Sequence, residues 1–244
     1  MKLCIQAGHA NITSGATGAP NEQSFNIDIA NTVCGELRKR GFEVKQTDAN
    51  ADKDPQVTSV DWDLFLAIHY DADIYNTGGG FVDYPEPLTD GATVESQRIA
   101  YLLRQEYFGT TKIVSHPERS NANTRYYYMW KVLSVKTPCN LIECGVGMHV
   151  PDDWNILHFD RPKVVEGIVK GICLAFNVPF TTTTISTSSS SSSSTTVTTP
   201  MPTTNTTLTT TMPSPPITPP LSLLQRLLKL EKCIKTCMEG GCQA

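Results

Sequence analysis

Three short apolar segments of this chain end on residues that can bind a metal ion or transfer a proton: His9, His69 and Glu143. Parallel sheets place ligand and catalytic groups just beyond the carboxyl ends of their strands. One histidine at a strand end would indicate little. Three such ends together predict one catalytic rim.

Glu22 extends this set, because it falls in the first turn of a predicted helix. Hydrolytic zinc sites use three protein ligands of the His and Glu type and leave a fourth position for water. His9, Glu22 and His69 match that count, and Glu143 is then the candidate general base and acid. Each residue alone has a plainer interpretation: a strand-end histidine that only makes hydrogen bonds, or a first-turn glutamate that favours the helix dipole.

Strand-like and helical segments alternate through the first 180 residues, which predicts an α/β fold with a twisted, mostly parallel sheet flanked by helices. The clearest helix has an apolar stripe at a spacing of four residues: Phe25, Ile29, Val33 and Leu37. After a first strand that leads to Gly8, we expect strands at 42–47, 64–68, 81–84 and 140–143. We expect helices at about 21–40, 94–108 and 162–176.

Composition divides the chain into three parts. Residues 1–180 are long enough to enclose one core and are predicted to form a single catalytic domain. Residues 181–220 contain 33 Ser, Thr and Pro among 40 positions, and such a segment buries too little apolar surface to offset its chain entropy. We expect a disordered linker there, followed at 221–244 by a short amphipathic helix and a cysteine-containing tail.

The tail has two open interpretations. Its apolar spacing favours a helix that self-associates or docks through residues 221–242, but an isolated helix of this length is barely stable without a partner. Cys233, Cys237 and Cys242 are either free thiols or form an intermolecular disulfide. The five cysteines of the first domain are expected to be buried free thiols: Cys4, Cys34, Cys139, Cys144 and Cys173.

Charge and hydropathy exclude several classes of protein. Residues 1–180 contain 16 Lys and Arg against 22 Asp and Glu, a formal charge of −6, which argues against nucleic-acid binding. No apolar stretch approaches the ~20 residues of a membrane helix. The first five residues lack the features of a signal peptide. We therefore expect a protein that is cytoplasmic, or that leaves the cell by a route other than a classical leader, for example when the membrane is breached.

The motifs resemble those of the zinc-dependent N-acetylmuramoyl-L-alanine amidases of the amidase type 3 family, including phage endolysins. The matching pieces are Gly8-His9, Glu22, Ile68-His69 and residues 141–145. The resemblance implies that His9, Glu22 and His69 bind Zn²⁺ and that Glu143 activates the water and protonates the departing amine. The substrate would be peptidoglycan, cut between the lactyl group of N-acetylmuramic acid and L-alanine of the stem peptide.

The chain departs from the family pattern after His69, where a small residue and an asparagine are usual but Tyr70 and Asp71 stand here. The loop between the second and third strands, residues 52–61, is also short. Two other functions stay open: a zinc peptidase that cleaves another cell-wall bond, and a cell-wall-binding module without turnover. Weaker site candidates are His116, His149, His158 and the aromatic cluster at 126–130.

Overall fold

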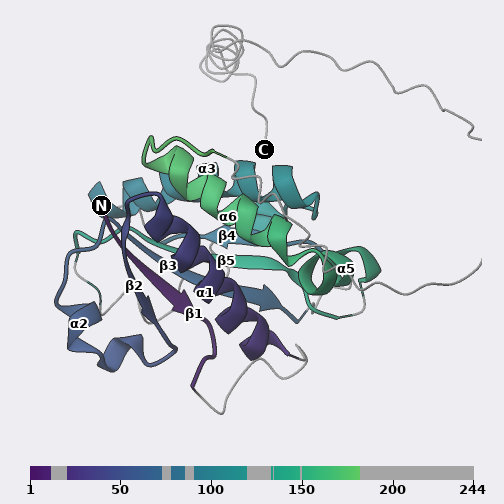
Figure 1. Cartoon of the computed structure of the whole chain (residues 1–244), viewed down its shortest axis with the longest axis horizontal. Coiled ribbons are helices and arrows are strands. Elements are labelled where there is room, and N and C mark those ends of the chain that lie inside the picture. Colours follow the sequence, from purple (N-terminus) through teal and green to yellow (C-terminus); the bar gives the residue numbers. More distant parts are fainter. Residues whose placement is uncertain are drawn as a thin grey trace, which may run out of the picture. The chain divides into compact units, whose positions relative to one another are not determined.

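The strands form a sheet in the order β2-β1-β3-β5-β4 (Figure 1). A computed structural model describes residues 1–11, 21–72, 78–85, 91–119, 133, 135–148 and 150–181. The strands are β1 (Lys2–Ala7), β2 (Glu43–Thr47), β3 (Leu64–Asp71), β4 (Phe81–Asp83) and β5 (Cys139–Val146). All neighbouring pairs are parallel except β4 with β5. The predicted mostly parallel sheet is confirmed.

The helices follow the predicted order with two additions, the short helices α2 and α5. They are α1 (Glu22–Lys39), α2 (Pro55–Thr58), α3 (Gly91–Thr111), α5 (Pro151–Phe159) and α6 (Arg161–Ala175), with 3₁₀ turns η1 (Ala51–Lys53) and η2 (Pro117–Arg119). The predicted helices at 21–40, 94–108 and 162–176 are confirmed, although α3 is longer at both ends. The sequence pattern missed α5, because nine residues show too little periodicity. No helix among the described residues is both long and apolar enough to cross a membrane.

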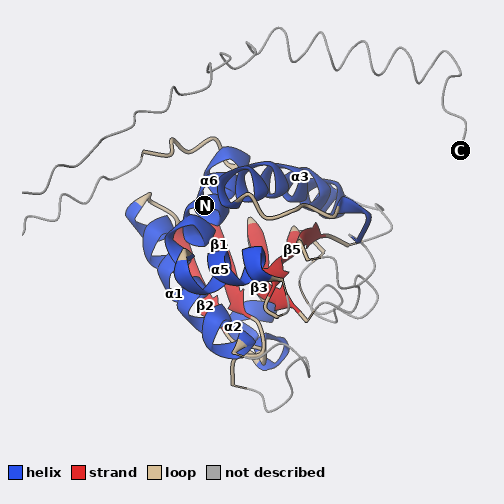
Figure 2. Ribbon diagram, turned by 90° about the vertical axis from the view of Figure 1, so that its right-hand side faces the viewer, coloured by secondary structure: helices blue, strands red, loops and turns tan. Residues whose placement is uncertain are grey.

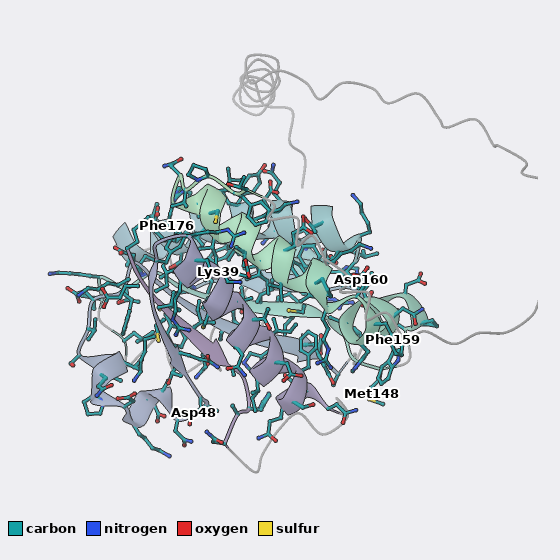
Figure 3. All side chains as sticks on the ribbon, in the orientation of Figure 1. Lys39, Asp48, Met148, Phe159, Asp160 and Phe176 are labelled. Atoms are coloured by element: carbon teal, nitrogen blue, oxygen red, sulfur yellow. The ribbon has the colours of Figure 1, made fainter. Side chains whose placement is uncertain are left out.

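Three long helices cover one face of the sheet. The whole apolar stripe of α1 is buried there against Leu3, Ile5 and Leu66, together with the inner sides of α3 and α6. Figure 2 shows α3 and α6 on one side of the sheet and α2 on the other, and Figure 3 shows side chains filling the space between these layers. Burying each Leu or Ile side chain contributes about 1.5–3 kcal/mol.

The opposite face carries a smaller core. Cys4, Phe65 and Leu141 lie on that face, against Val57 of α2 and Trp62. Side chains alternate between the two faces of a strand, so His69 and Glu143 fall on the same face as Phe65 and Leu141. This face therefore has an apolar centre and polar residues towards the carboxyl ends of β3 and β5.

The connections from β1 explain why a site forms at this edge. The chain passes from β1 through α1 to β2, and then crosses back through η1 and α2 to β3 on the other side of β1. The carboxyl ends of β1 and β3 thus flank the point where the strand order reverses, where open α/β sheets bind ligands.

The expectation that His69 and Glu143 end their strands is wrong. Both strands continue, to Asp71 and Val146, and these two residues pair after a shift in register. β1 does stop at Ala7, which pairs with Ile68. His69 is therefore the first residue of β3 beyond the end of β1, and it lies at the rim for that reason.

The chain divides into two units, Met1–Ile185 and Ser186–Ala244. The five cysteines of the first unit are buried and free, as predicted. The predicted linker beyond Thr181, the helix at 221–242 and Cys233, Cys237 and Cys242 lie outside the described residues, as do His149 and residues 126–130.

Candidate metal and catalytic site

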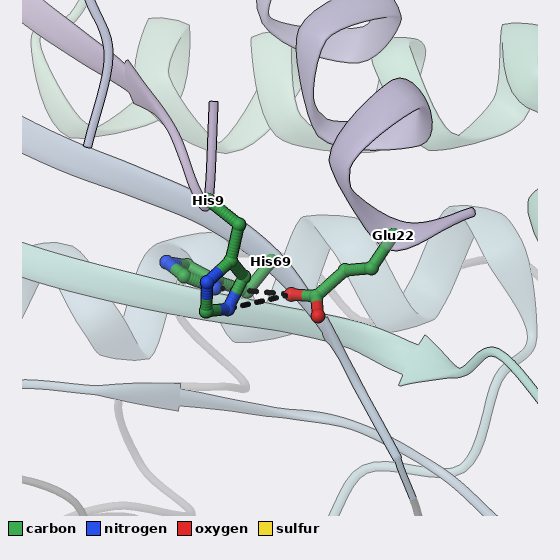
Figure 4. A group of neighbouring side chains, drawn as sticks. All are labelled: His9, Glu22 and His69. Atoms are coloured by element: carbon green, nitrogen blue, oxygen red, sulfur yellow. Dashed lines mark hydrogen bonds and ion pairs between the residues drawn. The ribbon is translucent and has the colours of Figure 1, made fainter. Parts of the chain in front are cut away.

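His9, Glu22 and His69 meet at the rim (Figure 4). Oε1 of Glu22 lies 3.4 Å from Nε2 of His9 and 3.1 Å from Nδ1 of His69. The two imidazole rings are nearly perpendicular, with centroids 4.9 Å apart. The side chain of Glu22 is 4% exposed, against 24% for His9 and 12% for His69. The sequence-predicted set is thus brought together from β3, α1 and the turn after β1.

This arrangement suits a divalent cation. Ligands of tetrahedral zinc at 2.0–2.1 Å lie about 3.3–3.4 Å from one another, close to the separations of 3.4 and 3.1 Å between Oε1 of Glu22 and the two histidine nitrogens. Oε2 of Glu22 is buried, and the part of the chain that the structure describes gives it no hydrogen-bond partner. A buried carboxylate is costly unless it is paired or coordinates a metal. The donor set therefore fits Zn²⁺.

The turn that carries His9 has an unusual backbone. His9 has φ of 57° and Asn11 has φ of 60°. Both lie in the left-handed region, which non-glycine residues adopt at an energetic cost, and such residues are found most often at functional sites. The amide N–H of Gly8 donates to the carbonyl of Ile68 at 3.0 Å. This hydrogen bond ties the turn to β3, one residue before His69.

A loop after β2 holds the other end of this turn. The amide of Asn11 donates to Oδ2 of Asp48 at 2.8 Å, and the backbone N–H of Ala49 donates to the carbonyl of Ala10 at 3.2 Å. The side chain of Gln6 donates to the carbonyl of Asp48 at 2.9 Å. Asp48, labelled in Figure 3, thus stabilises a left-handed turn far from it in sequence.

Glu143 lies beside the cluster. It is the register partner of His69 in the neighbouring strand, so both side chains project from the same face of the sheet. Burial, followed by the negative charges of Glu22, Asp71 and Asp83, raises the pKa of Glu143 well above its usual value. Its Oε2 is buried without a hydrogen-bond partner among the described residues. A carboxyl group in this environment holds a proton readily, as general acid–base catalysis requires.

The weaker histidine candidates do not join this cluster. Nδ1 of His116 contacts Oε1 of Glu118 at 2.6 Å. His158 stacks on Trp154 with ring centroids 3.8 Å apart, and burial lowers the pKa of His158. Tyr70, one of the departures from the family pattern, is buried against Phe25 on the opposite face from His69.

Sequence reasoning missed two residues that support the site. Asn26 is fully buried in α1 and donates a hydrogen bond to Glu22. Asp48 accepts a hydrogen bond from Asn11 in the turn that carries His9. A signal for Asn26 was present, because a polar side chain stands between Phe25 and Ile29 on a face predicted to be buried. No comparable signal exists for Asp48, whose role depends on tertiary contacts.

Residues 3–173, more than half of the chain, match the N-acetylmuramoyl-L-alanine amidase family. The chain belongs to this family. It is therefore a peptidoglycan amidase, a hydrolase that cleaves the amide between N-acetylmuramic acid and L-alanine. The matched range of this amidase includes His9, Glu22, His69 and Glu143.

Solved structures share the fold of this amidase. The amidase Ami1 of Mycobacterium smegmatis is 20% identical with a TM-score of 0.57, and the match covers 72% of this chain and 97% of that one. The catalytic domain of the amidase CwlV from Bacillus (Paenibacillus) polymyxa is 19% identical, with a TM-score of 0.54 and coverage of 73% and 99%. No curated protein matches the chain.

The catalytic domain of CD27L, an endolysin targeting Clostridia difficile, is 17% identical with a TM-score of 0.55, and the match covers 74% of this chain and 99% of that one. At identities of 17–20%, these three similarities show the fold alone.

Proposed function

We propose that this amidase is zinc-dependent, with His9, Glu22 and His69 as the metal ligands and Glu143 as the residue that transfers protons. The observation that carries the proposal is the convergence of two imidazole nitrogens and one buried carboxylate oxygen, all within 4.8 Å of one another. Bound there, Zn²⁺ would polarise the carbonyl of the scissile amide and lower the pKa of a water molecule.

The three ligand residues contribute charge and orientation. Glu22 supplies the single negative charge of the set, and its burial keeps competing water away from that carboxylate. His9 and His69 present their nitrogens from a strained turn and from a strand, so neither ring is carried by a freely moving loop. Such fixed side chains lose little entropy when the site is filled.

Glu143 is suited to proton transfer in two steps. As a carboxylate it accepts a proton from the attacking water, and as a carboxylic acid it donates that proton to the nitrogen of the departing L-alanine. Because its surroundings favour the protonated form, the carboxylic acid of Glu143 that is formed in the first step keeps its proton until the amine departs. Its position opposite His69 in the neighbouring strand supports a role beside the reacting groups as a residue that is not itself a ligand.

The experiment is release of new alanine amino termini from purified peptidoglycan. We expect release by the wild-type protein, loss of release with a chelator, and recovery when Zn²⁺ is added back. Undiminished release after complete removal of metal would contradict the proposal. Metal-dependent release of other amino termini would indicate a peptidase instead.

Matched variants separate the two proposed roles. His69→Ala is expected to abolish both metal binding and turnover. Glu143→Gln is expected to bind Zn²⁺ with unchanged stoichiometry but to lose about 10²–10⁴-fold in rate, the usual contribution of a general acid–base residue. A Glu143→Gln variant of wild-type activity would remove Glu143 from the mechanism.

The endolysin role, the cytoplasmic location before lysis and self-association through residues 221–242 stay predictions. Production of the protein inside a bacterial host, with and without a membrane-permeabilising agent, tests the first two. Lysis that depends on permeabilisation would support both. Sedimentation of the full chain and of a chain ending at Thr181 tests self-association.

A further inference from the structure

Asn26 occupies a position where packing alone would favour an apolar side chain. It is fully buried in α1, next to Phe25 and close to Ile29 and Ala30, which are buried as well. Its Oδ1 is buried and accepts no hydrogen bond from the described residues. A buried polar atom without a partner is costly, so the two N–H groups of the amide must offset a real penalty.

Both contacts of that amide lead to the metal site. Nδ2 of Asn26 donates to Oε1 of Glu22 at 3.3 Å and to the carbonyl oxygen of Gly8 at 3.0 Å. Oε1 is the oxygen that faces both histidines. Gly8 immediately precedes His9. One side chain therefore joins the carboxylate of the site to the backbone that carries one of the imidazoles.

A second amide of α1 extends the same contact. Nε2 of Gln23 donates to the carbonyl oxygen of His9 at 2.8 Å, so two consecutive carbonyls, those of Gly8 and His9, are held by side chains from the first turns of α1. The turn itself has a left-handed backbone at His9. The helix that supplies Glu22 thus also fixes the backbone of His9.

We propose that Asn26 is a positioning residue of the metal site, which fixes the Glu22 carboxylate and the turn carrying His9 relative to each other. This inference rests on the proposed binding of Zn²⁺ by His9, Glu22 and His69. Residues that hydrogen-bond to metal ligands orient them, and their loss typically costs about 10–100-fold in metal affinity. Asn26 acts on two ligands at once.

The test compares Asn26→Leu with Val33→Ala. Leucine keeps the branched shape and the number of heavy atoms of the Asn26 side chain and removes both N–H donors. Val33 is fully buried two helical turns further along the same face of α1, so its truncation weakens the helix packing without touching the site. Three quantities are measured on each full-length protein: Zn²⁺ affinity by competition with a chromophoric chelator, the visible spectrum of the Co²⁺-loaded protein, and thermal unfolding without metal.

We expect Asn26→Leu to bind Zn²⁺ about 10–100-fold more weakly than wild type and to show an altered Co²⁺ spectrum. Val33→Ala should lose thermal stability but keep the affinity and spectrum of wild type. Equal Zn²⁺ affinity in Asn26→Leu and wild type would overturn the inference. It would also be overturned if both variants lost Zn²⁺ affinity in proportion to their loss of thermal stability. A wild-type protein that binds no Zn²⁺ would instead overturn the proposed metal site.

A measurement on the wild-type protein alone avoids any dependence on folding of the variants. In the ¹⁵N-labelled protein, the side-chain amide resonances of Asn26 should shift when Zn²⁺ is added, whereas those of the exposed Asn31 should not. Unchanged Asn26 resonances on saturation with Zn²⁺ would contradict a positioning role.

Discussion

The imidazole of His69 lies directly against the α-carbon of Gly8. A methyl group built on Gly8 would lie 2.3 Å from Cε1 and 2.4 Å from Nε2 of the ring, distances at which one group must move. The position of the His69 ring therefore requires a glycine at position 8. His9 depends on the same turn, because it follows Gly8 and has a left-handed backbone there.

Replacement of Gly8 by alanine should displace His69 and disrupt the site. We expect Gly8→Ala to lose Zn²⁺ binding and amidase activity together, measured by chelator competition and by release of alanine amino termini. The matched control is Gly35→Ala in α1, where an added methyl group meets no atom within 4 Å. That change should leave activity intact and stabilise the protein by about 0.5–1 kcal/mol, since glycine is costly within a helix. Full activity in Gly8→Ala would show that His69 is not needed in this position.

Metal binding should raise the melting temperature of the protein. At free Zn²⁺ one hundred times the dissociation constant, a ligand that binds only the folded state adds about 2.7 kcal/mol, or roughly 5–10 °C for a domain of this size. His69→Ala should show no increase. His116→Ala is the control, because His116 contacts Glu118 outside the cluster, and its increase should equal that of wild type. A loss in both variants would indicate that Zn²⁺ binds histidines without regard to the cluster.

Glu143 should destabilise the metal-free protein at neutral pH. Its folded-state pKa is raised, first by burial and then by the charges of Glu22, Asp71 and Asp83. An acid with a raised pKa contributes no penalty below the pKa of the unfolded chain, about 4.3 for glutamate. As the pH rises above that value the unfolded state ionises first, so stability falls until the pH passes the folded-state pKa.

Glu143→Gln removes this penalty. At pH 7 we expect the metal-free variant to melt above metal-free wild type, although its amidase rate is expected to be much lower, and the difference should vanish below about pH 4. Thermal unfolding of both proteins between pH 3.5 and pH 8 measures it. A constant difference at all pH values would assign the effect to packing and not to ionisation of Glu143.

The sequence was sufficient for those parts of the site and fold that depend on local pattern. The stripe of α1 is periodic over about three turns, and the runs that contain His69 and Glu143 are strongly β-forming, so these elements and their order follow from local preferences. The grouping of His9, Glu22 and His69 was predicted because parallel strands place their carboxyl ends at one edge.

Long-range contacts set the remaining features. Asp48 accepts a hydrogen bond from Asn11 in another loop, and the local sequence of neither loop predicts this contact. The extension of β3 to Asp71 depends on pairing with Val146, which neither strand reveals alone. The short helix α5 forms where Leu157 is buried in the main core, so tertiary packing, and not periodicity, decides it.

Helices α3 and α6 pack closely at two glycines of α6. A methyl group on Gly171 would lie 2.8 Å from the α-carbon of Leu103, and one on Gly167 would lie 2.9 Å from that of Tyr107. Both contacts involve backbone atoms, which cannot rotate away. We expect Gly171→Ala to push the helices apart and to cost about 1–3 kcal/mol, as overpacking usually does.

Gly109→Ala is the matched control, since an added methyl group on that α3 residue meets no atom within 4 Å. It should melt at or above the wild-type temperature, whereas Gly171→Ala should melt several degrees lower. Because the two helices lie on the face of the sheet opposite His69 and Glu143, both variants should keep the wild-type affinity for Zn²⁺. Weakened metal binding in Gly171→Ala would mean that the packing of α6 on α3 also sets the geometry of the rim.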